Sequence, residues 1–356
     1  MTKRWLGAAF AAVFACLAPL AHAQEQDKEQ LTAEALAQIY KETLDEARRG
    51  DMGAQFQVAI ALWQGKGVKP DKIESAFWLE KAAEQGHKQA INRLAWHYRQ
   101  GVGVIQSVPR AEALYKQAFN LGVVGASVPL AAIYRSGEGR SVEDGGQGRV
   151  VENHAEAVRW ALIGAEAGID RGQNLLGELY RDGVGVPQDF ATALKYFDLA
   201  AQQEFPLAYY NASVIYRDGV GVEKNTEKGL EYLKRAADMG HAGAMIDLAL
   251  AYAEGRDLEQ SFDLALQWYS KAAQRNTRMA VKLAQAYEDG MFGGPDFARA
   301  YKWYYIAATA GEVSALVGRL AMKERIDDAT RLSMESEGDA WMEQAGVTRE
   351  AGIGAS

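Results

Sequence analysis

The heptapeptide YRDGVGV occurs twice in this chain, at Tyr180–Val186 and at Tyr216–Val222, and the two copies start 36 residues apart. Its tyrosine belongs to a longer series with spacings of 36, 46, 36, 36 and 35 residues, preceded by a leucine at the same interval. A glycine follows every member three residues later. The series, called here the reference position, is Leu62, Tyr98, Tyr134, Tyr180, Tyr216, Tyr252 and Tyr287. Self-similarity at this period predicts an array of about seven stacked repeats.

A second register, of paired small residues, keeps step with the first. Only Ala118-Phe119 departs from the pattern of two small side chains. Such pairs indicate helices that approach each other closely at that point. The pairs are Ala82-Ala83, Gly164-Ala165, Ala200-Ala201, Ala236-Ala237, Ala272-Ala273 and Ala307-Ala308.

Each unit is predicted to consist of two helices, called here the first and the second helix of a repeat. In the fourth unit, Leu175, Leu176 and Leu179 recur at helical spacing before the glycines. Gly183 is expected to end the first helix in the left-handed conformation, and Asp189 to cap the second. The second helix then presents an apolar face made of Ala193, Leu194, Phe197, Ala200 and Ala201.

Aromatic residues form a third column, four residues before the small pairs. Because one residue type recurs at one core register, we interpret this column as packing and not as a ligand site. The column consists of Trp78, Trp160, Tyr196, Tyr232, Trp268 and Trp303, with Leu114 in the remaining place.

The glycine pair could alternatively belong to a phosphate-binding loop. That interpretation requires a preceding strand, a third glycine or a Gly-Lys-Ser/Thr ending. None of these accompanies the motif, which also recurs from unit to unit. We therefore predict that the glycines are structural.

These units resemble Sel1-like repeats, relatives of the tetratricopeptide repeat with a longer glycine-containing link. The segments LGELYRDGVGVPQDFATALKYFDLAAQQ at Leu176–Gln203 and GKGVKPDKIESAFWLEKAAEQGHKQA at Gly65–Ala90 carry the resemblance. It covers about Asp51 to Gly311, and it implies an all-α fold, a right-handed α-solenoid that binds partners. Some members of the family staple each repeat with a disulfide. This chain departs from them, because its one cysteine lies near the N-terminus, at Cys16.

The predicted organisation places helical caps at both ends of the array. Ten extra residues in the third unit, rich in glycine and charge, predict a solvated loop at about 137–153. The segments are a signal peptide at 1–23, an N-terminal capping helix at 24–50, repeats at 51–311, a C-terminal helical cap at 312–345 and a flexible tail at 346–356.

The N-terminus has the features of a secretory signal. Lys3 and Arg4 precede an apolar run from Trp5 to Leu20, and Ala21-His22-Ala23 fits a small-x-small cleavage site. A lipoprotein anchored through Cys16 is the less favoured alternative. We therefore expect a periplasmic or secreted protein without a transmembrane segment in its mature form.

The acidic composition argues against nucleic-acid binding. Cleavage after Ala23 removes two of the 39 basic residues, so 47 acidic residues face 37 basic ones and the formal charge is −10. A nucleic-acid partner would require a basic face.

No catalytic, metal-binding or cofactor-binding constellation is predicted. Because His87 and His241 occupy the same repeat position with units between them, they cannot share a metal ion. No HExxH motif, nucleophile elbow or cysteine–histidine pair occurs. An enzyme is therefore the least favoured class.

A row of arginines is the most informative feature outside the core registers. The residue after the reference position is arginine in four consecutive units, and it is expected to share a face with residues two and five before that position. One interpretation is a partner-binding ladder, and the other is that each arginine favours a helix C-terminus or pairs with an acid such as Asp182. The candidate partner-binding residues are Trp63, Arg93, Trp96, Arg99, Arg135, Arg181 and Arg217.

The function predicted from the sequence is a non-enzymatic, periplasmic protein–protein interaction scaffold or regulator. Its partner would be another envelope or secreted protein, in a process such as signalling, polysaccharide export or motility-complex assembly. The alternative is a binding module for an acidic glycan or cell-wall fragment, which would use the arginines and tryptophans.

The leader makes a testable prediction. N-terminal sequencing of the exported protein should find Gln24 as the first residue, because Ala21-His22-Ala23 precedes it. A lipid-modified Cys16 at the new terminus would contradict both the cleavage site and the soluble form.

Overall fold

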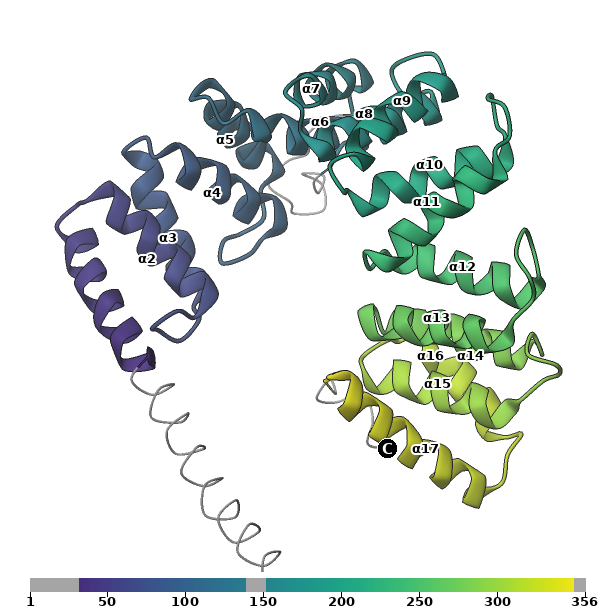
Figure 1. The fold of residues 1–356 in the computed structure, drawn as a ribbon. Helices are drawn as coiled ribbons and strands as arrows, with labels where there is room; N and C mark the ends of the chain where they lie inside the picture. The colour runs from purple at the N-terminus through teal and green to yellow at the C-terminus, as the bar shows by residue number, and fades with distance from the viewer. Residues whose placement is uncertain (1–31, 139–151, 349–356) are drawn as a thin grey trace, which may run out of the picture. The chain divides into compact units, whose positions relative to one another are not determined.

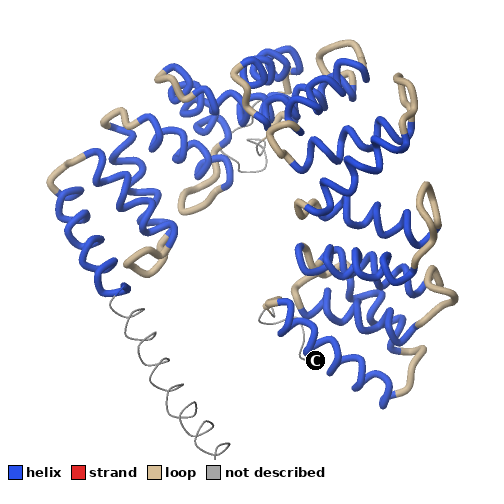
Figure 2. Tube along the Cα trace, viewed as in Figure 1, coloured by secondary structure: helices blue, strands red, loops and turns tan. Residues whose placement is uncertain are grey.

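The computed structural model describes residues 32–138 and 152–348, and within these ranges every regular element is a helix (Figures 1 and 2). The predicted signal peptide, most of the insertion and the end of the tail lie outside the described residues. The chain divides into two compact units, Met1–Ala167 and Gly168–Ser356, which are treated separately below.

The first unit contains an N-terminal helix at residues 32–48, inside the predicted capping segment. Three pairs of helices follow it. They are α2 (Met52–Gln64), α3 (Lys72–Glu84), α4 (Lys88–Gln100), α5 (Val108–Asn120), the short 3-10 helix η1 (Val124–Ala126), α6 (Ser127–Ser136) and α7 (His154–Glu166).

The second unit continues the alternation of first and second helices and ends in two helices beyond the repeats. Its helices are α8 (Asp170–Asp182), α9 (Phe190–Ala201), α10 (Pro206–Asp218), α11 (Thr226–Asp238), α12 (Ala242–Glu254), α13 (Phe262–Arg275), α14 (Arg278–Glu288), α15 (Phe297–Thr309), α16 (Ala315–Lys323) and α17 (Asp328–Ala345).

Within each repeat the first helix packs against its own second helix, and inside each compact unit the second helix also contacts the first helix of the next repeat. The small pairs lie at these contacts: Ala200 and Ala236, for example, are fully buried. The aromatic column is packed as well: Trp78, Trp160 and Trp303 are buried in their repeats, and the other aromatic members, Tyr196, Tyr232 and Trp268, are half-buried. The predicted role of both registers in packing is confirmed.

The first glycine of the motif ends the first helix as predicted. Gly183 has φ of 68° and its N–H bonds back to the Leu179 carbonyl. Gly219 repeats this geometry with φ of 67°. Asp189 then caps the second helix by accepting a hydrogen bond from the Thr192 N–H at 3.0 Å. A left-handed turn without a Cβ penalty is what this position requires.

Glycine is required at the second position of the motif for a different reason, which is a close contact with the preceding helix. A Cβ built at Gly103 would lie 2.0 Å from the Lys72 carbonyl oxygen of the preceding repeat, and one at Gly67 would lie 2.2 Å from the Leu36 carbonyl oxygen. The loop therefore touches the start of the preceding second helix, where no side chain fits. Where Asp257 replaces this glycine it keeps the left-handed φ, at 62°.

Gly103→Ala should destabilise the protein more than a matched change at another left-handed glycine. Gly122→Ala is that control, because Gly122 has φ of 88° in the same unit and a Cβ there meets nothing within 4 Å. The control should lose about 1–2 kcal/mol, which is the cost of the left-handed conformation alone. Denaturant unfolding measures both variants, and equal losses would contradict the close-approach explanation.

Candidate functional site

The candidate residues of the first unit gather at the C-terminal ends of α2 and α4. The Trp63 and Trp96 rings meet edge to face with centroids 5.3 Å apart. Trp96 is 38% exposed, and Lys72 lies 5.7 Å from the Trp63 ring centroid. Arg93 precedes Trp96 by three residues and so shares its side of α4. Arg93 makes no ion pair or hydrogen bond with another described residue. The structure thus brings Trp63, Arg93 and Trp96 together.

His97 contacts both tryptophans from the buried side of this cluster. The sequence patterns did not single it out as a site residue. Its ring centroid lies 5.2 Å from that of Trp63 and 5.4 Å from that of Trp96, and the residue is 1% exposed. Its Nδ1 is 2.7 Å from the Val102 carbonyl oxygen, so this nitrogen carries the proton and donates it. Burial lowers the pKa of His97; the Val102 bond opposes that shift and nearby Arg93 adds to it.

Arg99 lies next to this cluster but is engaged within the chain. Its Nε donates to Glu138 at 2.7 Å, and a second nitrogen bonds the other carboxylate oxygen. These hydrogen bonds raise the pKa of Arg99. Burial opposes ionisation of Glu138, but Arg99 outweighs it and the pKa of Glu138 lies below its ordinary value. A bidentate pair of this kind fixes the start of the insertion to the first helix of the preceding repeat.

The arginines of the second unit have internal neighbours as well. Arg181 donates to Asp182 at 2.7 Å and to the Asn211 side chain at 3.1 Å. The charge of Arg217 acts on Asp247 and lowers its pKa, although burial dominates and leaves that pKa raised. In the first unit, Arg135 is partly buried in the last turn of α6. For Arg181, the pairing with Asp182 weighed from the sequence is the observed arrangement.

Hydrogen bonds link successive first helices of the second unit. Asn211 of α10 donates to the Asn174 side chain of α8 at 3.0 Å. Tyr210 donates to Asp247 of α12 at 3.1 Å and stacks on His241 with centroids 4.6 Å apart. The same face is therefore aromatic and basic in the first unit but a polar network in the second.

The histidines at repeated turn positions cap helices. His87 accepts a hydrogen bond from the Ala90 N–H, and His241 from the Ala244 N–H, both at 3.1 Å. Among the described residues, no group of three histidine, cysteine or carboxylate side chains is arranged to hold a metal ion.

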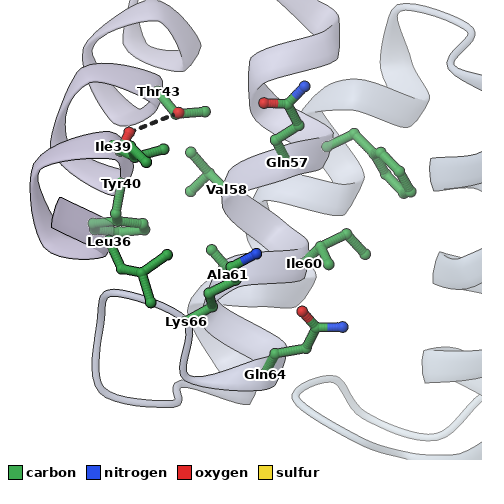
Figure 3. A pocket seen from close by; sticks show the side chains of 11 residues that line it. Leu36, Ile39, Tyr40, Thr43, Gln57, Val58, Ile60, Ala61, Gln64 and Lys66 are labelled. Atoms are coloured by element: carbon green, nitrogen blue, oxygen red, sulfur yellow. Dashed lines mark hydrogen bonds between the residues drawn. The ribbon is translucent and has the colours of Figure 1, made fainter. Parts of the chain in front are cut away.

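An apolar groove lies between the N-terminal helix and α2, with a volume of about 350 Å³ (Figure 3). Ile39 and Tyr40 line it from the N-terminal helix, and Ile60 and Ala61 from α2. Lys66 stands among its polar lining residues. Nothing in the sequence patterns of single repeats indicated this groove, because it exists only where the array begins.

The fold and these surfaces define an α-solenoid of helix-turn-helix repeats. The chain belongs to the Sel1 repeat family: the family model for the Sel1 repeat matches it seven times. The matched residues are 53–87, 88–123, 130–169, 170–205, 206–241, 242–276 and 278–312. Both the resemblance and the all-α solenoid predicted from the sequence are confirmed. Sel1 repeats mediate protein–protein interactions.

Three known proteins illustrate the similarity. The chitin synthase regulator SKT5 of Saccharomyces cerevisiae is 26% identical over 44% of this chain and 28% of its own length. Chitin synthase regulatory factor 3 of Schizosaccharomyces pombe is 29% identical over 46% of this chain and 25% of its own. This chain thus spans about a quarter of these relatives. A Sel1 repeat protein from Oxalobacter formigenes has a solved structure with a TM-score of 0.59 and 23% identity, which covers 68% of this chain and 94% of that one; it shows the fold alone.

Acidification should destabilise the protein through its buried histidines. The unfolded chain takes up a proton near the ordinary histidine pKa of about 6.5, whereas burial lowers the pKa of both His97 and His241 in the folded state. The free energy of unfolding therefore falls as the pH drops below about 6.5, until the folded-state pKa is passed, by at most about 1.4 kcal/mol per pH unit for each group. Asp247, whose pKa burial raises, acts in the opposite sense at lower pH.

The variant that tests this is His97→Gln, compared with His154→Gln at an exposed histidine. Melting temperatures between about pH 7.5 and pH 5.5 should show a smaller loss for His97→Gln than for the wild type, because the titrating group is gone. The readout is the slope with pH, since removing a buried ring also lowers stability at every pH. Parallel slopes for all three proteins would contradict the assignment.

Proposed function

We propose that this chain is an exported, non-enzymatic scaffold or regulator that binds another envelope protein through the aromatic–basic surface of its first unit. That surface is defined as Trp63, Arg93, Trp96 and Lys72. Its support is the one observation that Trp96 and Arg93 remain available beside a rigidly held ring cluster. The signal sequence supports export, and among the described residues no helix is long and apolar enough to cross a bilayer.

The chemistry of this surface suits an acidic segment that carries an apolar anchor. Tryptophan and arginine contribute most often to interface hot spots, and a preorganised cluster loses little entropy on binding. His97 keeps both indoles in place from the buried side. Arg93 and Lys72 supply two cations on the rim, whose attraction to a partner would be weakened by salt.

The regulated process we propose is the synthesis or export of a cell-surface polysaccharide. Two relatives with this repeat are named as regulators of chitin synthases. Their likeness covers less than half of this chain, so the shared element is the repeat array itself. Regulation of a membrane-bound synthase by a repeat protein would require the kind of protein-binding face described above.

A cross-linked pull-down from envelope extracts tests the surface. Trp96→Ala and Arg93→Ala should each reduce recovery of the wild type's partner several-fold while leaving the melting temperature nearly unchanged. Matched controls are Phe77→Ala, an exposed aromatic residue of α3, and Arg159→Ala, an exposed arginine of α7. If the control variants lose as much partner recovery as the test variants, or if the test variants lose none, the binding surface lies elsewhere.

The glycan alternative has its own outcome. If alginate oligosaccharides raise the melting temperature of the purified protein in a concentration-dependent way, and Trp96→Ala removes the effect, the surface binds an acidic glycan. A protein partner predicts no such shift in the absence of extract.

A further inference from the structure

Within residues 32–348, leaving the insertion aside, the array begins with a helix in the position of a second helix, and α16 has the register of a first helix without a second helix of its own. The Leu36 carbonyl of the N-terminal helix meets Gly67 in the way that the Lys72 carbonyl of α3 meets Gly103, at the same interval of 31 residues. The N-terminal helix therefore has the position of a second helix. It precedes the first matched repeat, at 53–87, and no first helix of its own is present among the described residues.

The apolar groove lies where a first helix paired with the N-terminal helix would pack. In complete repeats, Ser75 of α3 bonds the Ala59 carbonyl of its own first helix at 2.7 Å, and Ala193 of α9 lies against Gly177 of its own. Both are buried, at 1% and 0% exposure. The residue of the N-terminal helix at this register, 36 before Ser75, is Ile39, which is 57% exposed and lines the groove.

At the other end of the array, α16 has the register of a first helix. Ala315 and Met322 are fully buried, as are Ala244 and Ala251 at the matching positions of α12. The following helix does not become its second helix. Instead α17 packs on α15 (Figure 1). There the Trp341 ring meets the Trp303 ring with centroids 5.0 Å apart.

An apolar stripe of α16 is consequently bare. Leu320 lies three residues before the reference register, where Ala249 and Ala284 of complete repeats are fully buried against their own second helix, yet Leu320 is 62% exposed. Val317 of α16 is 76% exposed, and Val313, in the turn before the helix, is 64% exposed. Three exposed apolar side chains at helical spacing form a face that a further helix would cover.

We propose that α16 of one copy of this chain docks in the groove of a second copy, so that the two unpaired half-repeats form one complete repeat. A second copy is the occupant that the geometry favours, because each end lacks the helix type that the other end offers. The junction would continue the packing that joins first and second helices inside each compact unit.

The registers determine which side chains meet. Leu320 would face Ile39, as Gly177 faces Ala193. Val317 would face Gln57 of α2, because residues at its register contact those at the register of Gln57 in the second unit: Asn174 bonds Asn211, and Tyr210 bonds Asp247. Since the two surfaces differ, the contact is heterologous, and it can add copies at both ends.

Sedimentation velocity of the full chain over a wide range of concentrations tests this association. The average mass of the wild type should rise above that of the monomer as the concentration increases. Ile39→Glu and Leu320→Glu should each remain folded, because both side chains are exposed. Each variant should also remain monomeric, because docking would bury the new carboxylate without a partner for its charge. An equimolar mixture of the two variants should form a 1:1 dimer and nothing larger, since one intact end remains on each.

The matched controls are Ile105→Glu, at an isoleucine that is 74% exposed, and Leu332→Glu, at a leucine of α17 that is 57% exposed. Both should associate like the wild type. In a Cys16→Ser background, Ile39→Cys and Leu320→Cys on separate copies should form a disulfide, which requires Cα atoms about 4.4–6.8 Å apart.

The proposal is overturned if the wild type is monomeric at all concentrations, or if the mixed variants fail to dimerise. A dimer that survives Ile39→Glu but not Leu320→Glu would indicate a symmetric α16 contact instead. The double variant that carries Ile39→Cys and Leu320→Cys on the same chain gives a further check. If its two new thiols form only an intramolecular disulfide, with no cross-linked dimer, the occupant of the groove is not a second copy.

Discussion

The close approach of the backbones of neighbouring helices and loops is the constraint on which this fold depends. The loop after α2 touches the start of the N-terminal helix and the loop after α4 touches the start of α3, and at Gly103 the available space excludes even a methyl group. The fully buried alanines at Ala200 and Ala236 place neighbouring helices at similarly short range. Since each repeat contacts only its neighbours, small residues recur where neighbouring helices meet, and the recurrence is visible as a period in the sequence.

The fold could be predicted because its causes are local and repeated. The left-handed Gly183, the Asp189 cap and the small pairs are each set by residues within one repeat. The sequence DKIE at Asp71–Glu74 has the form of a capping box, but only half of the box is formed: Asp71 accepts from the Ile73 and Glu74 N–H groups, while the Glu74 side chain accepts from Trp78 at 3.3 Å. A tryptophan one turn away competes for the same carboxylate.

The candidate site was less predictable, because partners from other repeats decide the fate of a side chain. Four arginines share a register, yet Arg99 is engaged by Glu138 across 39 residues and Arg181 by Asn211 across 30. The repeat register determines where the Cα atom of each arginine lies, but it does not determine which side chain of another repeat faces that arginine. His97 was missed for the same reason, since its burial depends on Trp63 of the preceding repeat. Whether these residues bind a partner stays a prediction.

The hydrogen bonds between first helices of the second unit have a mechanical consequence. Asn211 to Asn174 and Tyr210 to Asp247 are directional links between neighbouring repeats, and a change in the angle between those repeats stretches or bends them. In the first unit Trp63 and Trp96 also join neighbouring repeats, but through a ring-to-ring contact that His97 supports from its buried side. We therefore expect the repeats of the second unit to resist changes in their mutual angle through the directional bonds of the amides and of the half-buried Asp247 carboxylate, whereas the first unit resists them through the packing of rings.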